Sequence, residues 1–229
     1  MTLFVIATPI GNLKDLSERA KTTLASVHTV LCEDTRNTRK LFTSISLPGS
    51  EKGPYLMSFH QHSDDTKVKT VIELLEQGHD LALVTDAGTP GISDPGGKLI
   101  EALVKHFGST LTISPIPGPS AVVAALSVSG FPTDEFVFLG FPPNKKGRQK
   151  FFDQLSEFDM TIVFYESTHR ILKTLDEIKK RFPDRQLVVC RELTKLHETI
   201  YRGTAGEVTE KLKTSSIKGE FVIINKNKG

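Results

Sequence analysis

The first half of the chain alternates short apolar runs with amphipathic helical patterns, and this alternation constrains the fold more than any other feature. Short apolar strands joined by helices are typical of a parallel sheet that is covered by helices on both faces. The sequence predicts its strands at residues 3–7, 30–32, 55–59, 81–85 and 111–113. It predicts the helices between them at residues 16–27, 35–42, 65–77 and 98–107. We therefore expect an α/β domain in this half.

A segment with three prolines and one glycine, SPIPGPSA at residues 114–121, interrupts the alternation. It is typical of a linker that ends where a helix begins, here at residues 121–128. Beyond it, strands are expected at 136–139, 161–165, 186–190, 199–201 and 221–224, and helices at 171–181 and 208–212. Some of these strands follow one another directly, which indicates a mixed sheet. The sequence thus predicts two α/β domains, residues 1–117 and 118–229, with a ligand cleft between them.

The composition indicates a globular protein. Hydrophobic residues make up 38% of the 229 residues and charged residues 24%, which suits a packed core. The apolar runs are far shorter than a membrane span, and the N-terminus has no basic leader. Cys32 and Cys190 each end an apolar run, so we expect buried thiols in a reducing, cytoplasmic compartment. No metal site is expected, because no CxxC or HxxxH spacing occurs.

Three loops rich in glycine and proline follow predicted strands: ATPIGNLKDLS at 7–17, TDAGTPGISDPGG at 85–97 and PIPGPSA at 115–121. Parallel strands end at the same edge of a sheet, where ligands bind in open α/β folds, so these loops are expected to line one edge. Their spacing fits neither a dinucleotide fingerprint nor a P-loop. Asp86 and Asp94 favour a ligand with hydroxyl or cationic groups. The alternative is two ordinary turns, with Asp94 capping the next helix.

Charged side chains follow the second predicted strand, in LCEDTRNTR. Glu33 and Asp34 end that strand, and Arg36 and Arg39 lie three residues apart on one face of the next helix. One interpretation places this group beside a bound substrate, with the arginines holding phosphate. The other is a helix N-terminus with acidic residues in its first turn, which the helix dipole favours.

Two strand ends in the second half have similar charge content, in YESTHR and CRELTK. They suggest a second set of charged residues that faces the first domain. The candidate catalytic residues of this set are Glu166, Arg191, Glu192 and Lys195. The alternative is an Arg–Glu network that holds the domains together. His60 and His62, after the third strand, are expected to add a polar lining to the acceptor pocket.

The second half also carries the basic excess of the chain. Residues 1–117 hold 11 Lys and Arg against 13 Asp and Glu, whereas residues 118–229 hold 18 against 14. The densest cluster, in PPNKKGRQKF, consists of Lys145, Lys146, Arg148 and Lys150. Such a cluster is expected to bind RNA phosphates with a salt-dependent affinity. The alternative is a solvated loop and helix start, which is common for charged runs.

Together these segments resemble the tetrapyrrole methylase superfamily, and more narrowly its ribosomal RNA methyltransferases. The motifs that carry the resemblance run in order from residue 3 to about residue 225: ATPIGNLKDLS, LCEDTRNTRKLF, SFHQHS, DAGTPGISDPG, PIPGPSA, FLGFPP, FYESTHR and RELTKLHE. The resemblance implies two α/β domains, S-adenosyl-L-methionine in the cleft between them, and usually a homodimer. It further implies 2′-O-ribose methylation of a cytidine in the decoding region of 16S ribosomal RNA, with that RNA or the small ribosomal subunit as the partner.

The resemblance also implies which residues of this chain contact the methyl donor. The expected contacts are Pro9, Gly11, Asp86, Ala87, Gly88, Ile92, Ser93, Asp94, Ser120, Ala121, Leu139 and Phe141. Thr168 stands in FYESTHR where proline is commoner, and we expect this to change only local rigidity. Relatives often continue past GEFVIIN into a helical segment. If that segment binds RNA, the affinity of this chain is expected to come from elsewhere, or the chain to be a truncated form.

Two other functions stay open at this point. A porphyrin-type methylase that acts on a small macrocycle would share the fold, but the basic cluster with Arg36 and Arg39 favours RNA. A non-catalytic RNA-binding module would not need glycine-rich loops at three strand ends. The sequence therefore predicts an enzyme, an S-adenosylmethionine-dependent RNA methyltransferase.

Overall fold

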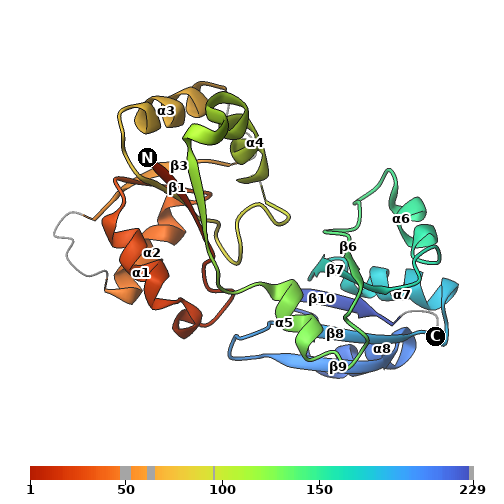
Figure 1. Ribbon diagram of the computed structural model, residues 1–229. Coiled ribbons are helices and arrows are strands. Elements are labelled where there is room, and N and C mark those ends of the chain that lie inside the picture. Colours follow the sequence, from red (N-terminus) through yellow and green to blue (C-terminus); the bar gives the residue numbers. More distant parts are fainter. Residues whose placement is uncertain (47–52, 61–64, 95, 227–229) are drawn as a thin grey trace. The chain divides into compact units, whose positions relative to one another are not determined.

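The computed structural model describes residues 1–46, 53–60, 65–94 and 96–226. The chain divides into two compact units, Met1–Ser120 and Ala121–Gly229, which are drawn in Figure 1 and described separately below. The sequence placed this boundary after residue 117. In the structure it lies where the loop after the last strand of the first unit gives way to a helix of the second.

The N-terminal unit is built on a five-stranded parallel sheet with the order β3-β2-β4-β1-β5. Its strands are β1 (Thr2–Ile6), β2 (Thr29–Cys32), β3 (Tyr55–Ser58), β4 (Leu81–Leu83) and β5 (Thr112–Ile116). Strand β1 pairs with β4 on one side and with β5 on the other, so that Leu3 lies opposite both Leu81 and Ile113. The loops that follow these three strands therefore begin side by side.

Helices cover both faces of this sheet, as the sequence predicts (Figure 1). They are η1 (Leu13–Asp15), α1 (Glu18–Ser26), α2 (Thr35–Ile45), α3 (Asp65–Glu76), α4 (Gly96–Phe107) and η2 (Gly108–Thr110). Alternate side chains of a strand point to opposite faces. Leu81 and Leu83 accordingly pack with the apolar side of α3 and α4, whereas Ala82 packs with α1.

The C-terminal unit has a mixed five-stranded sheet with the order β6-β7-β10-β8-β9, in which only the β6–β7 pair is parallel. The strands are β6 (Phe136–Phe138), β7 (Thr161–Ser167), β8 (Gln186–Arg191), β9 (Thr199–Thr204) and β10 (Glu220–Asn225). The helices are α5 (Ala121–Ser127), α6 (Arg148–Gln154), α7 (Ile171–Arg181) and α8 (Ala205–Thr214). Side chains of α6, α7 and α8 share one core with the sheet, and α5 packs against β7 and β10.

Three of the differences from the sequence-based expectation have a clear structural cause. Strand β5 runs through Pro115, where the sequence predicted a linker. This strand lies at the edge of its sheet, so a proline costs no hydrogen bond there. Helix α6 begins at Arg148, directly after Gly147 with φ 86°, within the basic run. Helix α8 starts at Ala205 because Thr204 and Glu207 form a capping box.

Both cysteines are free and buried. Burial raises the pKa of the Cys190 thiol to about 11 and also raises the pKa of Cys32. Within the described ranges, no helix is long and apolar enough to cross a bilayer.

Candidate functional site

The loops that follow β1, β4 and β5 meet at the carboxyl edge of the parallel sheet. Thr8 and Gly88 exchange two backbone hydrogen bonds, of 2.9 and 3.0 Å. The Thr89 hydroxyl donates to the Pro119 carbonyl oxygen at 3.1 Å. The three glycine-rich segments are therefore one connected structure, as expected for loops that follow neighbouring parallel strands.

Glycine allows this close approach at two positions. Gly88 has φ 87°, in the left-handed region that side chains disfavour. A Cβ on Gly118 would lie 3.0 Å from the Cβ of Ala7, and thus closer than ordinary packing permits. The absence of side chains at these two positions therefore lets the loops after β1, β4 and β5 pack closely against one another.

Asp94 organises the loop between β4 and α4. Its Oδ1 accepts hydrogen bonds from the backbone of Gly91 at 2.8 Å and of Gly96 at 2.7 Å, so it caps α4 as the alternative interpretation expected. Its Oδ2 is buried and has no hydrogen-bond partner in the described part of the chain. A buried carboxylate oxygen without a partner is costly unless a ligand satisfies it. The loop therefore fits a ligand that brings a hydroxyl or ammonium group.

Three carboxylates gather beside this loop. The backbone N–H of Asp34 donates to Asp86 Oδ1 at 3.3 Å, and the Thr85 hydroxyl donates to Glu33 Oε2 at 3.4 Å. Partial loss of hydration, and then the charge of Asp86, raise the pKa of Glu33. A raised pKa makes Glu33 a better proton acceptor than an ordinary surface glutamate.

Asp34 has a different role. It is the N-cap of α2 and accepts from the backbone N–H of Arg36 at 2.8 Å. The Arg36 guanidinium bonds the same carboxylate at 2.7 Å. These bonds lower the pKa of Asp34 to about 2, with the side-chain hydrogen bond from Arg36 as the largest cause. Both interpretations of this segment are thus compatible with the structure, because the acidic cap leaves Arg36 exposed at the surface.

A pocket of about 220 Å³ lies between the loop after β1 and helix α2. Its lining includes three residues expected at the methyl-donor site, namely Pro9, Gly11 and Asp86. It also includes residues of α2 that the sequence analysis missed, namely Asn37, Thr38, Lys40, Leu41 and Ser44. Residues spaced by three and four lie on one face of a helix. This spacing, next to a glycine-rich loop, is the signal that would have found them.

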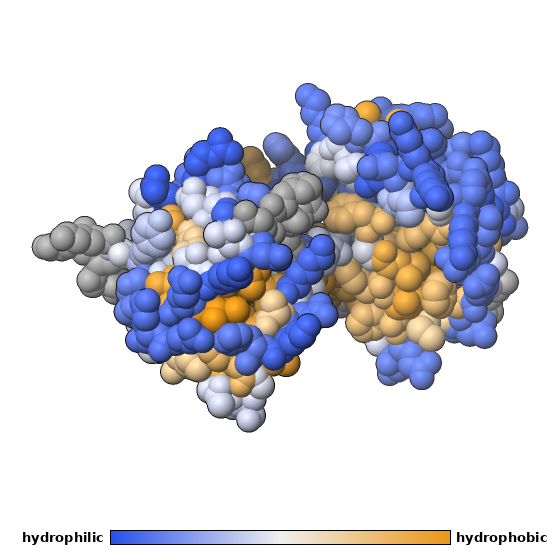
Figure 2. Space-filling view, turned by 90° about the horizontal axis from the view of Figure 1, so that it is seen from above, coloured by the Kyte–Doolittle hydropathy of each residue, from blue (hydrophilic) through white to orange (hydrophobic). Residues whose placement is uncertain are grey.

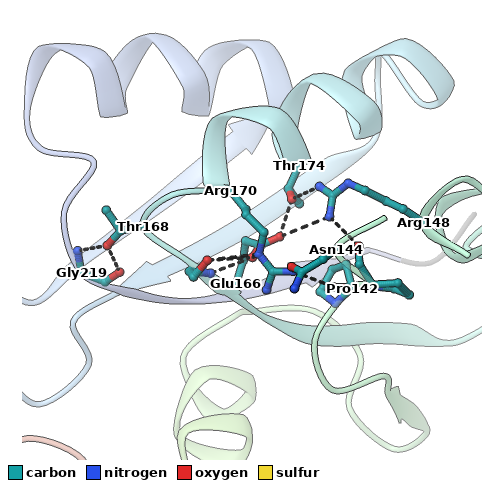
Figure 3. A network of polar contacts seen from close by, with 10 residues as sticks. Pro142, Asn144, Arg148, Glu166, Thr168, Arg170, Thr174 and Gly219 are labelled. Atoms are coloured by element: carbon teal, nitrogen blue, oxygen red, sulfur yellow. Dashed lines mark hydrogen bonds and ion pairs between the residues drawn. The ribbon is translucent and has the colours of Figure 1, made fainter. Parts of the chain in front are cut away.

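Glu166 lies at the centre of a buried network in the C-terminal unit (Figure 3). Its side chain is 0% exposed and pairs with Arg170 at 2.9 Å. Thr174 donates to Glu166 and accepts from Arg148 Nη2 at 2.7 Å. Arg170 also reaches the Pro142 carbonyl oxygen at 2.8 Å. This network ties β7, α7, α6 and the loop before α6 together, and it leaves Glu166 no surface for an acceptor.

Arg148 is separated from the other basic residues of its cluster. Its side chain is 7% exposed and lies 4.0 Å from Glu166, whereas Lys145, Lys146 and Lys150 are exposed. In this structure the Arg148 guanidinium is therefore a packing group, and the three lysines are the ones that RNA could reach.

The other three candidate catalytic residues belong to a second network. Arg191 donates to the carbonyl oxygens of Lys218 at 2.6 Å and His197 at 3.1 Å. Lys195 bridges Glu192 and Glu220, at 2.9 Å from each. These contacts fix the loop between β8 and β9. The four candidate catalytic residues are therefore divided between two networks, one around Glu166 and one around this loop.

This loop carries backbone strain. Glu192 has φ 51° and Thr194 has φ 66°, which is uncommon for residues other than glycine. Such conformations persist where the surrounding contacts hold them, and they cluster at functional sites. The loop between β8 and β9 therefore stays a candidate for an acceptor-side role.

Thr168 does more than adjust local rigidity. Its hydroxyl donates to the Gly219 carbonyl oxygen at 2.6 Å and accepts from the Gly219 N–H at 2.7 Å (Figure 3). A Cβ on Gly219 would lie 2.6 Å from Glu192 Cγ. The hydroxyl thus joins the end of β7 to the start of β10, a link that proline cannot make.

The remaining predicted residues lie as follows. Ala87, Ile92 and Ser93 are exposed on the loop after β4, and Phe141 is 49% exposed after β6. Ser120, Ala121 and Leu139 are half-buried, and Arg39 is exposed on α2. Their roles stay predictions. His62 lies outside the described residues, and among those that are described no group of three His, Cys, Asp or Glu is arranged to hold a metal ion.

Comparison with known proteins identifies the family. A family model described as Tetrapyrrole (Corrin/Porphyrin) Methylases matches residues 2–209. The chain belongs to this family. It is therefore a methyltransferase, and its cofactor is S-adenosyl-L-methionine.

Three similar curated proteins share the name Ribosomal RNA small subunit methyltransferase I. The protein from Halalkalibacterium halodurans is 41% identical over 229 residues, which are 100% of this chain and 76% of that protein. The protein from Hydrogenobaculum sp. is 41% identical and covers 98% of this chain and 95% of its own length. The Thermotoga maritima protein is 38% identical, with 97% and 96% covered.

Solved structures of the same fold are more distant in sequence. The cobalt precorrin-4 methyltransferase CbiF superposes with a TM-score of 0.71 at 19% identity, over 98% of this chain and 94% of that one. Uroporphyrin-III C-methyl transferase from Thermus thermophilus, complexed with S-adenyl homocysteine, has a TM-score of 0.63 at 16% identity, over 98% and 97%. These likenesses establish the fold.

Replacing Gly88 with alanine should weaken binding of the methyl donor. Gly78 offers a matched control, since its φ of 85° is close to the 87° of Gly88 and no atom lies within 4 Å of its Cβ position. Gly88→Ala and Gly78→Ala should each lower the free energy of unfolding by about 1–2 kcal/mol. Only Gly88→Ala should also lower donor affinity in calorimetry, because it disturbs the bridge to Thr8. Equal donor affinity in both variants would contradict this.

Glu166→Gln should act on stability. Removing one partner of a buried ion pair leaves the other charge uncompensated, and this typically costs about 3–5 kcal/mol. The matched control is Asp176→Asn, which breaks the exposed pair of Asp176 with Lys180 and should cost about 0–1 kcal/mol. Denaturant unfolding measures both. A Glu166→Gln protein that is inactive yet as stable as the parent would instead support a direct catalytic role.

Proposed function

We propose that this protein methylates 16S ribosomal RNA of the small ribosomal subunit, at the ribose 2′-oxygen of a cytidine in the decoding region. The observation that carries the proposal is the similarity, over almost the whole chain, to proteins named Ribosomal RNA small subunit methyltransferase I. The exposed lysines before and within α6 agree with an RNA substrate.

The methyl donor is assigned to the edge where the three loops meet. S-adenosylmethionine supplies an electrophilic methyl group on a sulfonium centre. Asp94 Oδ2 lacks a partner, and a ribose hydroxyl or the ammonium group of the donor would satisfy it. Gly88 and Gly118 let the three loops at this edge pack closely against one another. Positioning of the acceptor hydroxyl in line with the methyl group supplies much of the rate.

RNA phosphates are assigned to two exposed basic groups. One is formed by Lys145, Lys146 and Lys150, and the other by Arg36 and Arg39 on α2. Arg148 is left out of the first group because it is buried against Glu166. Phosphate contacts of this kind position the RNA and make its affinity depend on salt.

A homodimer in the cytoplasm completes the proposal. Figure 2 shows a broad apolar area on the C-terminal unit. The exposed large hydrophobic side chains of this unit are Val123, Val128, Phe136, Phe141, Leu196 and Ile217. Exposed apolar areas mark interaction surfaces, which agrees with the dimer that the resemblance implies.

The decisive experiment offers small subunits that lack the modification, together with labelled S-adenosylmethionine and the purified protein. Mass spectrometry of the digested RNA should find one methylated cytidine whose label survives on the ribose. Label on a base, or on no nucleotide, would refute the proposal. Methyl transfer to uroporphyrin and not to RNA would establish the macrocycle alternative. Absence of any S-adenosylmethionine binding in calorimetry would leave the non-catalytic module.

Removing the three exposed lysines should weaken RNA binding and spare donor binding. The test uses a triple variant with Lys145→Gln, Lys146→Gln and Lys150→Gln. The slope of the logarithm of RNA affinity against the logarithm of salt concentration should become shallower by up to about 0.9 per lost phosphate contact. The control variant carries the same change at the exposed residues Lys69, Lys98 and Lys105 of α3 and α4. Filter binding across a salt series measures the slope. Equal slopes in the two variants would assign the RNA surface to another part of the protein.

A further inference from the structure

The pocket between the loop after β1 and helix α2 has a polar floor built around Asp86. Asp86 Oδ1 accepts from the backbone of Asp34 at 3.3 Å, and Oδ2 accepts from Asn37 Nδ2 at 2.8 Å. Since a carboxylate can only accept, the amide nitrogen of Asn37 must face Asp86, and the amide oxygen remains as a further acceptor. Asp86 is therefore held toward α2 and presents acceptor oxygens to the pocket.

Hydroxyl groups extend this acceptor character along the walls. The hydroxyl of Thr8 donates to the Thr85 carbonyl oxygen at 3.0 Å, and that of Thr38 to the Asp34 carbonyl oxygen at 3.2 Å. Ser44 on the same side donates to the Lys40 carbonyl oxygen at 2.8 Å. Because their protons are engaged by the backbone, these groups offer lone pairs to a ligand.

Lys40 supplies the opposite charge. Its side chain lines the pocket and is exposed, and among the described residues its ammonium makes no ion pair. A ligand that fits must therefore combine hydrogen-bond donors, for Asp86 and Asn37, with an acceptor for Lys40.

The rest of the wall is apolar and the space is small. Pro9, Leu13 and Leu41 line it, and Leu13 is 46% exposed. The volume of about 220 Å³ lies below the roughly 300–1,000 Å³ of pockets that take drug-sized ligands. A pocket of this size suits one flat ring in contact with apolar side chains, which is how enzymes bind a flipped-out base.

We propose that this pocket takes the base of the acceptor nucleotide and selects cytosine. The exocyclic amino group of cytosine donates to Asp86 and to Asn37 Oδ1, and the ring carbonyl oxygen accepts from Lys40. Uracil presents an acceptor oxygen in place of the amino group, so it meets the carboxylate of Asp86 without a hydrogen bond. The inference rests on the proposed function and adds to it the residues that choose the nucleotide.

The test compares small subunits reconstituted with cytidine or uridine at the acceptor position, once mass spectrometry has located it. We measure kcat/KM for the parent protein, Asp86→Asn and Lys40→Gln. The parent should prefer cytidine by about ten- to a hundredfold. Asp86→Asn should reduce that preference at least tenfold, because its amide can donate to uracil. Lys40→Gln should lower kcat/KM for cytidine, and the exposed-lysine control Lys69→Gln should not.

Donor affinity and thermal midpoints of all variants separate recognition from folding. A folded Asp86→Asn protein with parental donor affinity and an unchanged preference for cytidine would overturn the inference. So would a large loss of donor affinity in that variant, because Asp86 would then belong to the donor site. Lack of methylation by the parent protein would refute the proposed function itself, and the pocket assignment with it.

Discussion

The paired backbone hydrogen bonds between Thr8 and Gly88 hold the functional edge of the N-terminal unit together. They join the loop after β1 to the loop after β4 at the point where both strands end. The bond from Thr89 to Pro119 adds the loop after β5. The glycine-rich loop after β4 and the wall of the pocket beside α2 depend on this junction, because each includes residues of a loop that the junction fixes. The carboxylates after β2 contact the same loop through Thr85 and Asp86.

The C-terminal unit keeps charged side chains buried at its mixed sheet. Glu166 is buried with Arg170 and Arg148, and Thr174 satisfies groups on both sides. Buried charges are tolerated only when they are paired and hydrogen-bonded. Glu166, which the sequence suggested as a catalytic residue, therefore holds the end of its strand in place. The neighbouring Arg191 holds the strained loop between β8 and β9.

The order of apolar runs was enough to predict the parallel sheet, its covering helices and the mixed second sheet, because periodicity reports which face of an element is buried. Contacts between distant residues were not predictable. Burial of Arg148 depends on Glu166 and Thr174 in other elements. Pro115 could be placed in a strand only once that strand was known to lie at an edge. The spacing of Asn37 and Lys40 places both on one face of α2. The pocket itself was not predictable, because its opposite wall comes from the loop after β1.

Asp94 shows how much of the binding loop is organised before any ligand arrives. One of its oxygens holds Gly91 and Gly96 in place, and the other remains buried and unpaired. These two hydrogen bonds form on folding and restrict the loop in advance, which lowers the conformational entropy lost when a ligand binds. A single carboxylate thus links two points of the loop and keeps one oxygen for the molecule that binds there.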